Sequence, residues 1–99
     1  MFILELTYTA PLERIDALLP AHVEWLERHY ADGVFLASGR KVPRDGGVIL
    51  AAAGDRAAIE AVAATDPFAR EGAAAYRITE FVATTTGPEL AAHRRTLPA

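Results

Sequence analysis

The sequence predicts an α+β fold of the ferredoxin-like type, in which the elements follow the order β-α-β-β-α-β. Short segments with a two-residue alternation, or rich in β-branched and aromatic residues, indicate strands, and longer segments with a 3.6-residue period indicate helices. This order is typical of a four-stranded antiparallel sheet with both helices on one face. The strands are expected at residues 2–9, 34–41, 48–53 and 75–84, and the helices at residues 11–31 and 55–64.

Length and composition fit one globular domain. The chain has 99 residues, 52% of them hydrophobic and 23% charged, so we expect one domain over residues 1–84 and a C-terminal tail over residues 85–99. A net charge of −3, without a long Lys or Arg run, argues against nucleic-acid and membrane-surface partners. The absence of cysteine excludes disulfides and thiolate chemistry. Since the sequence has no long apolar run and no basic N-terminal region, a cytoplasmic location is expected.

The first helix is expected to begin at Pro11, because proline suits the first helical position. Pro20 should interrupt it, since its ring clashes with the carbonyl of Asp16 and it lacks an N–H group. We therefore expect a kink or a break at Pro20, a second segment to about Ala31 and a stop at Gly33. The apolar period is carried by Ile15, Leu18, Leu19, Val23 and Leu26.

Aspartates next to glycine or proline indicate a turn and two further helix starts. Asp45-Gly46 is a hairpin signal, because both central positions of a type I′ turn need positive φ. Asp55 suits the N-cap of the second helix. Asp66 is expected to cap a short helical turn that has Pro67 at its first position.

One face of the predicted sheet is left uncovered by helices. On the first strand this face carries Ile3, Glu5 and Thr7, since side chains alternate across a strand. A partly apolar open face is a candidate interface, so we predict a homodimer joined through the sheets. The other strands would add apolar groups such as Phe35, Ala37 and Phe81 or their neighbours.

His22 and Asp66 are the candidate pair for acid–base chemistry. His22 lies four residues from both Leu18 and Leu26, so a core histidine with one hydrogen bond is the alternative. If Pro20 opens a new segment, His22 lies in its first turn, where the positive helix end disfavours imidazolium and leaves a ring that accepts a proton. Asp66 could be only a cap. A carboxylate has about four lone-pair sites, however, so it could cap and also hold a ring N–H of His22.

Ser38, Gly39 and Phe68 are expected to contact a substrate. Ser38 lacks the glycine-flanked elbow of hydrolase nucleophiles, so a hydrogen bond to a ligand is favoured over a Ser-His-Asp triad. Gly39 would permit close approach of a ligand, and Phe68 is a core residue or a wall of the cleft. His29 lies about 10 Å from His22 along the helix. That is too far to share a zinc ion, and we expect no metal site.

An ordered set of segments resembles the YciI-like (YCII-related) proteins of the dimeric α/β-barrel superfamily. The resemblance implies a ferredoxin-like protomer, a dimer, and a cleft with a His–Asp pair as the proposed active site; by position these are His22 and Asp66. One departure is Arg40, which follows Ser-Gly where relatives often have proline. The resemblance covers residues 2–83, and its segments are residues 2–8, 21–26 (Ala-His-Val-Glu-Trp-Leu), 33–39 (Gly-Val-Phe-Leu-Ala-Ser-Gly), 46–50, Asp66-Pro67-Phe68 with Gly72, and the strand that ends at Phe81.

The leading hypothesis is a small cofactor-independent enzyme of isomerase, lyase or dehydrohalogenase type. His22 would act as general acid or base on a small organic molecule, oriented by Asp66, in a cleft between the helices and the hairpin. One alternative is a non-catalytic dimeric module that binds a small metabolite or regulates. Another is a structural dimer that recruits partners through residues 85–99.

Overall fold

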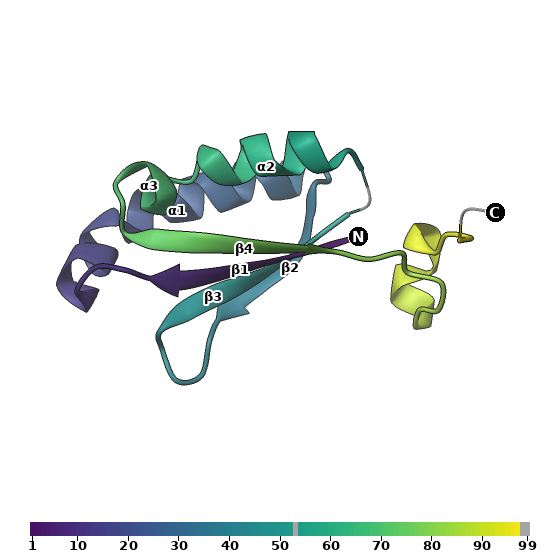
Figure 1. Cartoon of the computed structure of the whole chain (residues 1–99), viewed down its shortest axis with the longest axis horizontal. Coiled ribbons are helices and arrows are strands. Elements are labelled where there is room, and N and C mark those ends of the chain that lie inside the picture. The colour runs from purple at the N-terminus through teal and green to yellow at the C-terminus, as the bar shows by residue number, and fades with distance from the viewer. Residues whose placement is uncertain (53, 98–99) are drawn as a thin grey trace.

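The computed structural model describes residues 1–52 and 54–97. Its four strands form one antiparallel sheet in the order β2-β3-β1-β4, and the three α-helices lie on one face of it (Figure 1). This is the ferredoxin-like α+β arrangement, so the predicted fold class is confirmed. The elements are β1 (Phe2–Tyr8), α1 (Leu12–Ala31), β2 (Phe35–Arg40), β3 (Gly46–Ala51), α2 (Arg56–Ala64), α3 (Pro67–Arg70), β4 (Ala74–Glu80) and a 3₁₀ helix, η1 (Pro88–His93).

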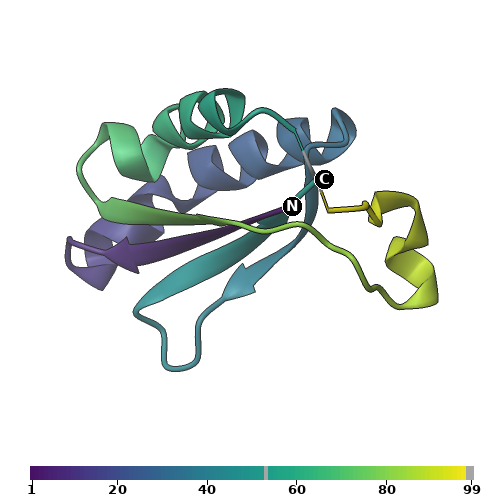
Figure 2. The same cartoon turned by 45° about the vertical axis from the view of Figure 1, so that its right-hand side comes forward.

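The hydrophobic core lies between the sheet and the helices. The alternation of β1 places Phe2, Leu4 and Leu6 in this core, whereas Ile3 on the opposite face is 39% exposed. Trp25 of α1 is fully buried in the same layer. Complete burial of a large apolar side chain contributes about 1.5–3 kcal/mol, so the alternation of β1 determines which face of the sheet receives the helices. Figure 2 shows α1 and α2 running side by side over that face, with the other face of the sheet uncovered.

Of the kink or break expected at Pro20, the break is wrong, because α1 continues through this residue. The helix begins at Leu12, with Pro11 as its N-cap, and the chain leaves it through Gly33 at φ 75°. Pro20 and Asp16 are both exposed, so water can hydrate the Asp16 carbonyl that loses its helical partner. The face of α1 that packs on the sheet extends across the proline and holds both halves in one helix; its buried residues are Ile15, His22 and Trp25.

Asp45-Gly46 does not form the predicted type I′ turn. Within the described residues, positive φ angles occur only at Gly33 and Gly72. Gly46 is instead the first residue of β3 and lies so close to β1 that a Cβ atom there would come 1.8 Å from the Leu6 carbonyl oxygen. The expected end of this strand at residue 53 lies outside the described residues.

A β-bulge in β2 changes which of its side chains face the helices. Phe35 pairs with Ala51 and Ala37 with Leu50, so the register shifts between Phe35 and Ala37. Phe35 is only 2% exposed, and its expected position on the open face is wrong. Because a bulge adds one unpaired residue, the alternation after it is reversed. Ser38 therefore shares the helix-covered face with Phe35.

The segment after β4 lies away from the helices and is closed by a backbone hydrogen bond between two of its own residues. It runs beyond the ends of the strands to the exposed helix η1 (Figure 1). The Arg95 N–H donates to the Ala83 carbonyl at 2.9 Å. Across residues 1–52 and 54–97, the structure has no helix with the length and apolar character needed to cross a membrane.

Candidate active site

His22 and Asp66, which are 44 positions apart, form a buried hydrogen bond. The His22 Nδ1 atom lies 2.8 Å from Asp66 Oδ1. His22 comes from the interior of α1, and Asp66 is the residue directly before α3. The expectation that His22 lies at a helix start is therefore wrong, so the helix-end argument for its proton affinity does not apply. Its orientation comes from Asp66 and from the rings packed on it.

The Asp66 carboxylate is fully buried and accepts three hydrogen bonds. Oδ1 accepts from His22 Nδ1 at 2.8 Å and from the Phe68 backbone N–H at 3.0 Å. Oδ2 accepts from the Tyr76 hydroxyl at 2.5 Å. Capping of α3 and support of the imidazole therefore coexist on one carboxylate. An ionised carboxylate can only accept hydrogen bonds, so the Nδ1 atom of His22 carries the proton when its partner is the Asp66 carboxylate anion.

Tyr76 is a member of this group that the sequence analysis missed. In the sheet Tyr76 pairs with Leu6, whose side chain faces the core. The alternation of side chains along β4 is the only sequence signal that could have indicated that Tyr76 faces the core. Burial raises the pKa of the Tyr76 hydroxyl, and the charge of Asp66 and its hydrogen bond raise it further. Tyr76 therefore keeps its proton and donates a hydrogen bond to Asp66.

The retained proton of Tyr76 predicts a loss of stability at high pH. Above pH of about 10 the unfolded chain releases this proton whereas the folded chain keeps it, so the free energy of unfolding falls as pH rises. The Tyr76→Phe variant has no such proton. Its free energy of unfolding, measured with urea between neutral pH and pH of about 11, should therefore fall less steeply than that of the wild type. Tyr30→Phe removes an exposed hydroxyl and serves as the control. Equal slopes for Tyr76→Phe and the wild type would contradict this assignment.

Two aromatic side chains fix the plane of the His22 ring. Phe68 stacks on it with a centroid distance of 4.1 Å and an interplanar angle of 11°. Trp25 stacks at 5.5 Å and 29°, and its own indole N–H donates to Thr65 Oγ1 at 2.9 Å. The His22 side chain is nevertheless 11% exposed. The imidazole is thus held by aromatic packing and a carboxylate while part of it remains accessible.

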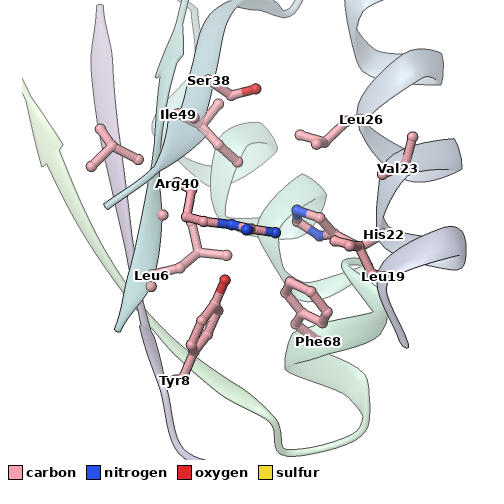
Figure 3. A pocket seen from close by; sticks show the side chains of 14 residues that line it. Leu6, Tyr8, Leu19, His22, Val23, Leu26, Ser38, Arg40, Ile49 and Phe68 are labelled. Atoms are coloured by element: carbon pink, nitrogen blue, oxygen red, sulfur yellow. The ribbon is translucent and has the colours of Figure 1, made fainter. Parts of the chain in front are cut away.

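The exposed part of His22 lies at a cavity of about 300 Å³ between α1, α3 and the β2–β3 hairpin (Figure 3). Ser38, Gly39 and Phe68 line this cavity together with His22, whereas Asp66 lies behind the histidine and is not in the lining. The volume is at the lower end of the range for small-molecule sites. The apolar walls come mainly from Leu6, Leu19, Val23, Leu26 and Ile49, and two further polar side chains in the lining are Tyr8 and Arg40.

Ser38 does not contact His22 in a way that would support a nucleophile. Its hydroxyl accepts a hydrogen bond from the Tyr30 hydroxyl at 2.6 Å. A base within hydrogen-bond reach is the requirement for an activated serine. Among the hydrogen bonds of the described residues, none joins Ser38 to His22. The arrangement therefore fits a ligand contact better than a Ser-His-Asp triad.

His29 does not extend the site toward a metal centre. It packs against Trp25 and Phe35 with centroid distances of 5.2 Å to each. Burial is the main cause that lowers the pKa of His29. In the part of the chain that the structure describes, no group of three or more His, Asp or Glu side chains is placed to hold a metal ion.

The fold and the cavity define a small α+β protein with a ligand-sized site next to a buried His–Asp pair. Residues 1–82 match the YCII-related domain. The chain therefore belongs to the YCII-related family. Among solved structures it is similar to the 5-chloro-2-hydroxyhydroquinone dehydrochlorinase (TftG) from Burkholderia phenoliruptrix AC1100, in complex with 2,5-dihydroxybenzoquinone. The TM-score is 0.65 at 20% identity, and the match covers 82% of this chain and 93% of that chain. The comparison with curated proteins gives no match.

Proposed function

We propose that this chain is a small enzyme that moves a proton on a small organic molecule, with His22 as the general base or acid. The observation that carries the proposal is the hydrogen bond between His22 Nδ1 and Asp66 at 2.8 Å, beside an open cavity. When Nδ1 is bound to a carboxylate, Nε2 is the nitrogen left to exchange a proton with a ligand. Asp66 keeps the ring in one tautomer and stabilises the imidazolium that forms after proton uptake.

The surroundings of His22 favour proton transfer over covalent catalysis. Phe68 and Trp25 hold the ring plane, and the cavity walls are largely apolar. A positioned base of this kind typically contributes about 10²–10⁴-fold in rate. Proton abstraction from a carbon or hydroxyl group, followed by return of the proton elsewhere or loss of a leaving group, gives isomerisation or elimination. In an elimination of HCl the base takes the proton and the chlorine leaves as chloride.

Elimination is supported by the likeness to TftG, a dehydrochlorinase that has been solved with a quinone. The test is chloride release from 5-chloro-2-hydroxyhydroquinone by the purified chain, followed together with incorporation of solvent deuterium into substrate and product. Chloride release would identify an elimination. Deuterium incorporation without chloride release would instead identify an isomerase-type proton transfer. If neither occurs with this compound, the dehydrohalogenase form of the proposal is excluded.

We further propose that the chain forms a homodimer through the uncovered face of its sheet. The register places Ile3 opposite Leu50, and Leu50 opposite Ala37, on this face. Ile3 is 39% exposed and Val48 is 38% exposed. A partly apolar sheet face that no helix covers is a candidate for a buried interface.

The dimer proposal predicts that one charge on this face separates the subunits. In light scattering at micromolar concentration we expect the wild type at twice the 10.6 kDa mass of one chain, and Ile3→Lys at the mass of one chain. The physical reason is that two lysines related by dimer symmetry would be buried together without partners. Leu12→Lys, at an exposed apolar residue of α1, is the matched control and should remain dimeric. A monomeric wild type would refute the proposal.

A further inference from the structure

We propose that Arg40 makes this site selective for a small carboxylate, whose charged group binds the guanidinium while its apolar part lies against the cavity walls. The inference rests on the proposed function, since it names the class of molecule on which His22 would act. Arg40 carries a positive charge on the strand that borders the site.

The bulge in β2 is what directs Arg40 into the cavity. Ser38 pairs with Ile49, which is 2% exposed, and Arg40 pairs with Gly47 two positions further along. Because alternate residues share a face, Arg40 lies on the helix-covered side with Ser38. Figure 3 shows its side chain extending from the strand into the cavity toward the His22 ring. Without the bulge, the same residue would lie on the open face of the sheet.

The charge of Arg40 is not taken up by an acidic partner. Among the ion pairs and side-chain hydrogen bonds of residues 1–52 and 54–97, none involves the Arg40 guanidinium. The neighbouring cation, Arg44, is bound to Asp16 Oδ1 at 2.5 Å. The pKa of Asp16 is lowered mainly by this hydrogen bond and to a smaller extent by the charges of Arg44 and Arg40. Arg40 is therefore the cation at the cavity that remains available to a ligand.

The other groups in the lining suit the remainder of such a molecule. A guanidinium presents its donors in a planar fork that matches the two oxygens of a carboxylate. The Tyr8 hydroxyl points into the same space from the sheet, below Arg40 in Figure 3, and offers one more donor. Leu19, Val23 and Leu26 of α1 form an apolar wall beside His22. A carboxylate on Arg40 would thus place the apolar body of the ligand alongside the imidazole.

Binding of a matched pair of probes tests this selectivity without any assay of activity. Benzoate and benzamide have the same shape and differ in charge, and their affinities can be measured by NMR titration of the Arg40 Nε–H and backbone N–H signals. We expect benzoate to bind about tenfold more tightly than benzamide, because a charge-assisted hydrogen bond is stronger than a neutral one. In Arg40→Gln this preference should disappear while benzamide binding is retained. The preference in the wild type should also weaken at high salt.

Two control variants separate this inference from the proposed function. Arg44→Gln removes the same charge from the same hairpin, but at a residue already paired with Asp16, and should keep the preference for benzoate. His22→Ala should also keep it, since the carboxylate is bound by Arg40. Benzoate binding no tighter than benzamide, or an unchanged preference in Arg40→Gln, would overturn the role of Arg40 and leave the acid–base role of His22 standing. If His22→Ala is inactive but still prefers benzoate to benzamide, this result supports both the role of Arg40 and the acid–base role of His22.

Discussion

Replacing His22 with alanine is expected to lower kcat/KM by about 10²–10⁴-fold, because the variant loses the group that exchanges the proton. The same change leaves Asp66 Oδ1 with only the Phe68 N–H as a partner. A loss of one buried hydrogen-bond partner costs about 1–3 kcal/mol, so the variant should still fold. Steady-state kinetics on a substrate identified by the proton-transfer assay, together with urea unfolding, measures both effects.

A control on the same helix separates catalysis from packing. His29→Ala removes a second histidine of α1 that packs against Trp25 and Phe35 but does not line the cavity. It should lower stability without lowering kcat by more than a few-fold. If His22→Ala retained wild-type kcat/KM, the acid–base role would be refuted, and the cavity would be interpreted as a binding site alone.

Replacing Asp66 with alanine is expected to cost about 3–5 kcal/mol of unfolding free energy, one of the largest single effects in this chain. The change removes the cap of α3 and leaves His22 Nδ1 and the Tyr76 hydroxyl without their acceptor in the core. Urea unfolding followed by fluorescence measures the loss. The single tryptophan, Trp25, is fully buried and stacks on His22, so its emission reports on this region.

Asp66→Asn separates the two roles of this carboxylate. The asparagine oxygen can still accept from the Phe68 N–H and from His22, and the Tyr76 hydroxyl can accept from the new amide group. We therefore expect most of the stability to return. Activity should remain low, by about 10²-fold or more, because a neutral amide does not stabilise the imidazolium. Full activity in Asp66→Asn would contradict the role of the carboxylate charge, and wild-type stability in Asp66→Ala would contradict its place in the core.

Local features of the fold could be predicted because they depend on a few neighbouring residues. Asp55 and Asp66 cap the helices that follow them, with side-chain oxygens that accept from Ala57 and Phe68. Gly33 adopts the positive φ that ends α1. The alternation of β1 correctly indicates its buried face. Caps, helix stops and alternation each follow from chemistry within about one turn or one strand.

The incorrect predictions involve residues whose conformation is decided by distant parts of the chain. Pro20 should break an isolated helix, but the packed face of α1 holds the helix together on both sides of it. Phe35 is drawn into the core by a bulge that is visible only in the pairing of β2 with β3. Gly46 continues a strand because β1 lies against it. In each case burial against another element outweighs the local preference.

The order of the elements and the available chemical groups could be predicted from the sequence, because hydrophobic period and residue type are local properties of the chain. The resemblance to YCII-related proteins indicated the pairing of His22 with Asp66. The folded structure was needed to show that His22 and Asp66 meet at 2.8 Å, that Tyr76 completes their hydrogen bonds, and that the cavity opens beside them. It also decided that Arg40 faces this cavity, since the bulge in β2 reverses the alternation. The reason is physical: a contact between residues 44 positions apart depends on how the helices pack on the sheet. That packing is a property of the whole core.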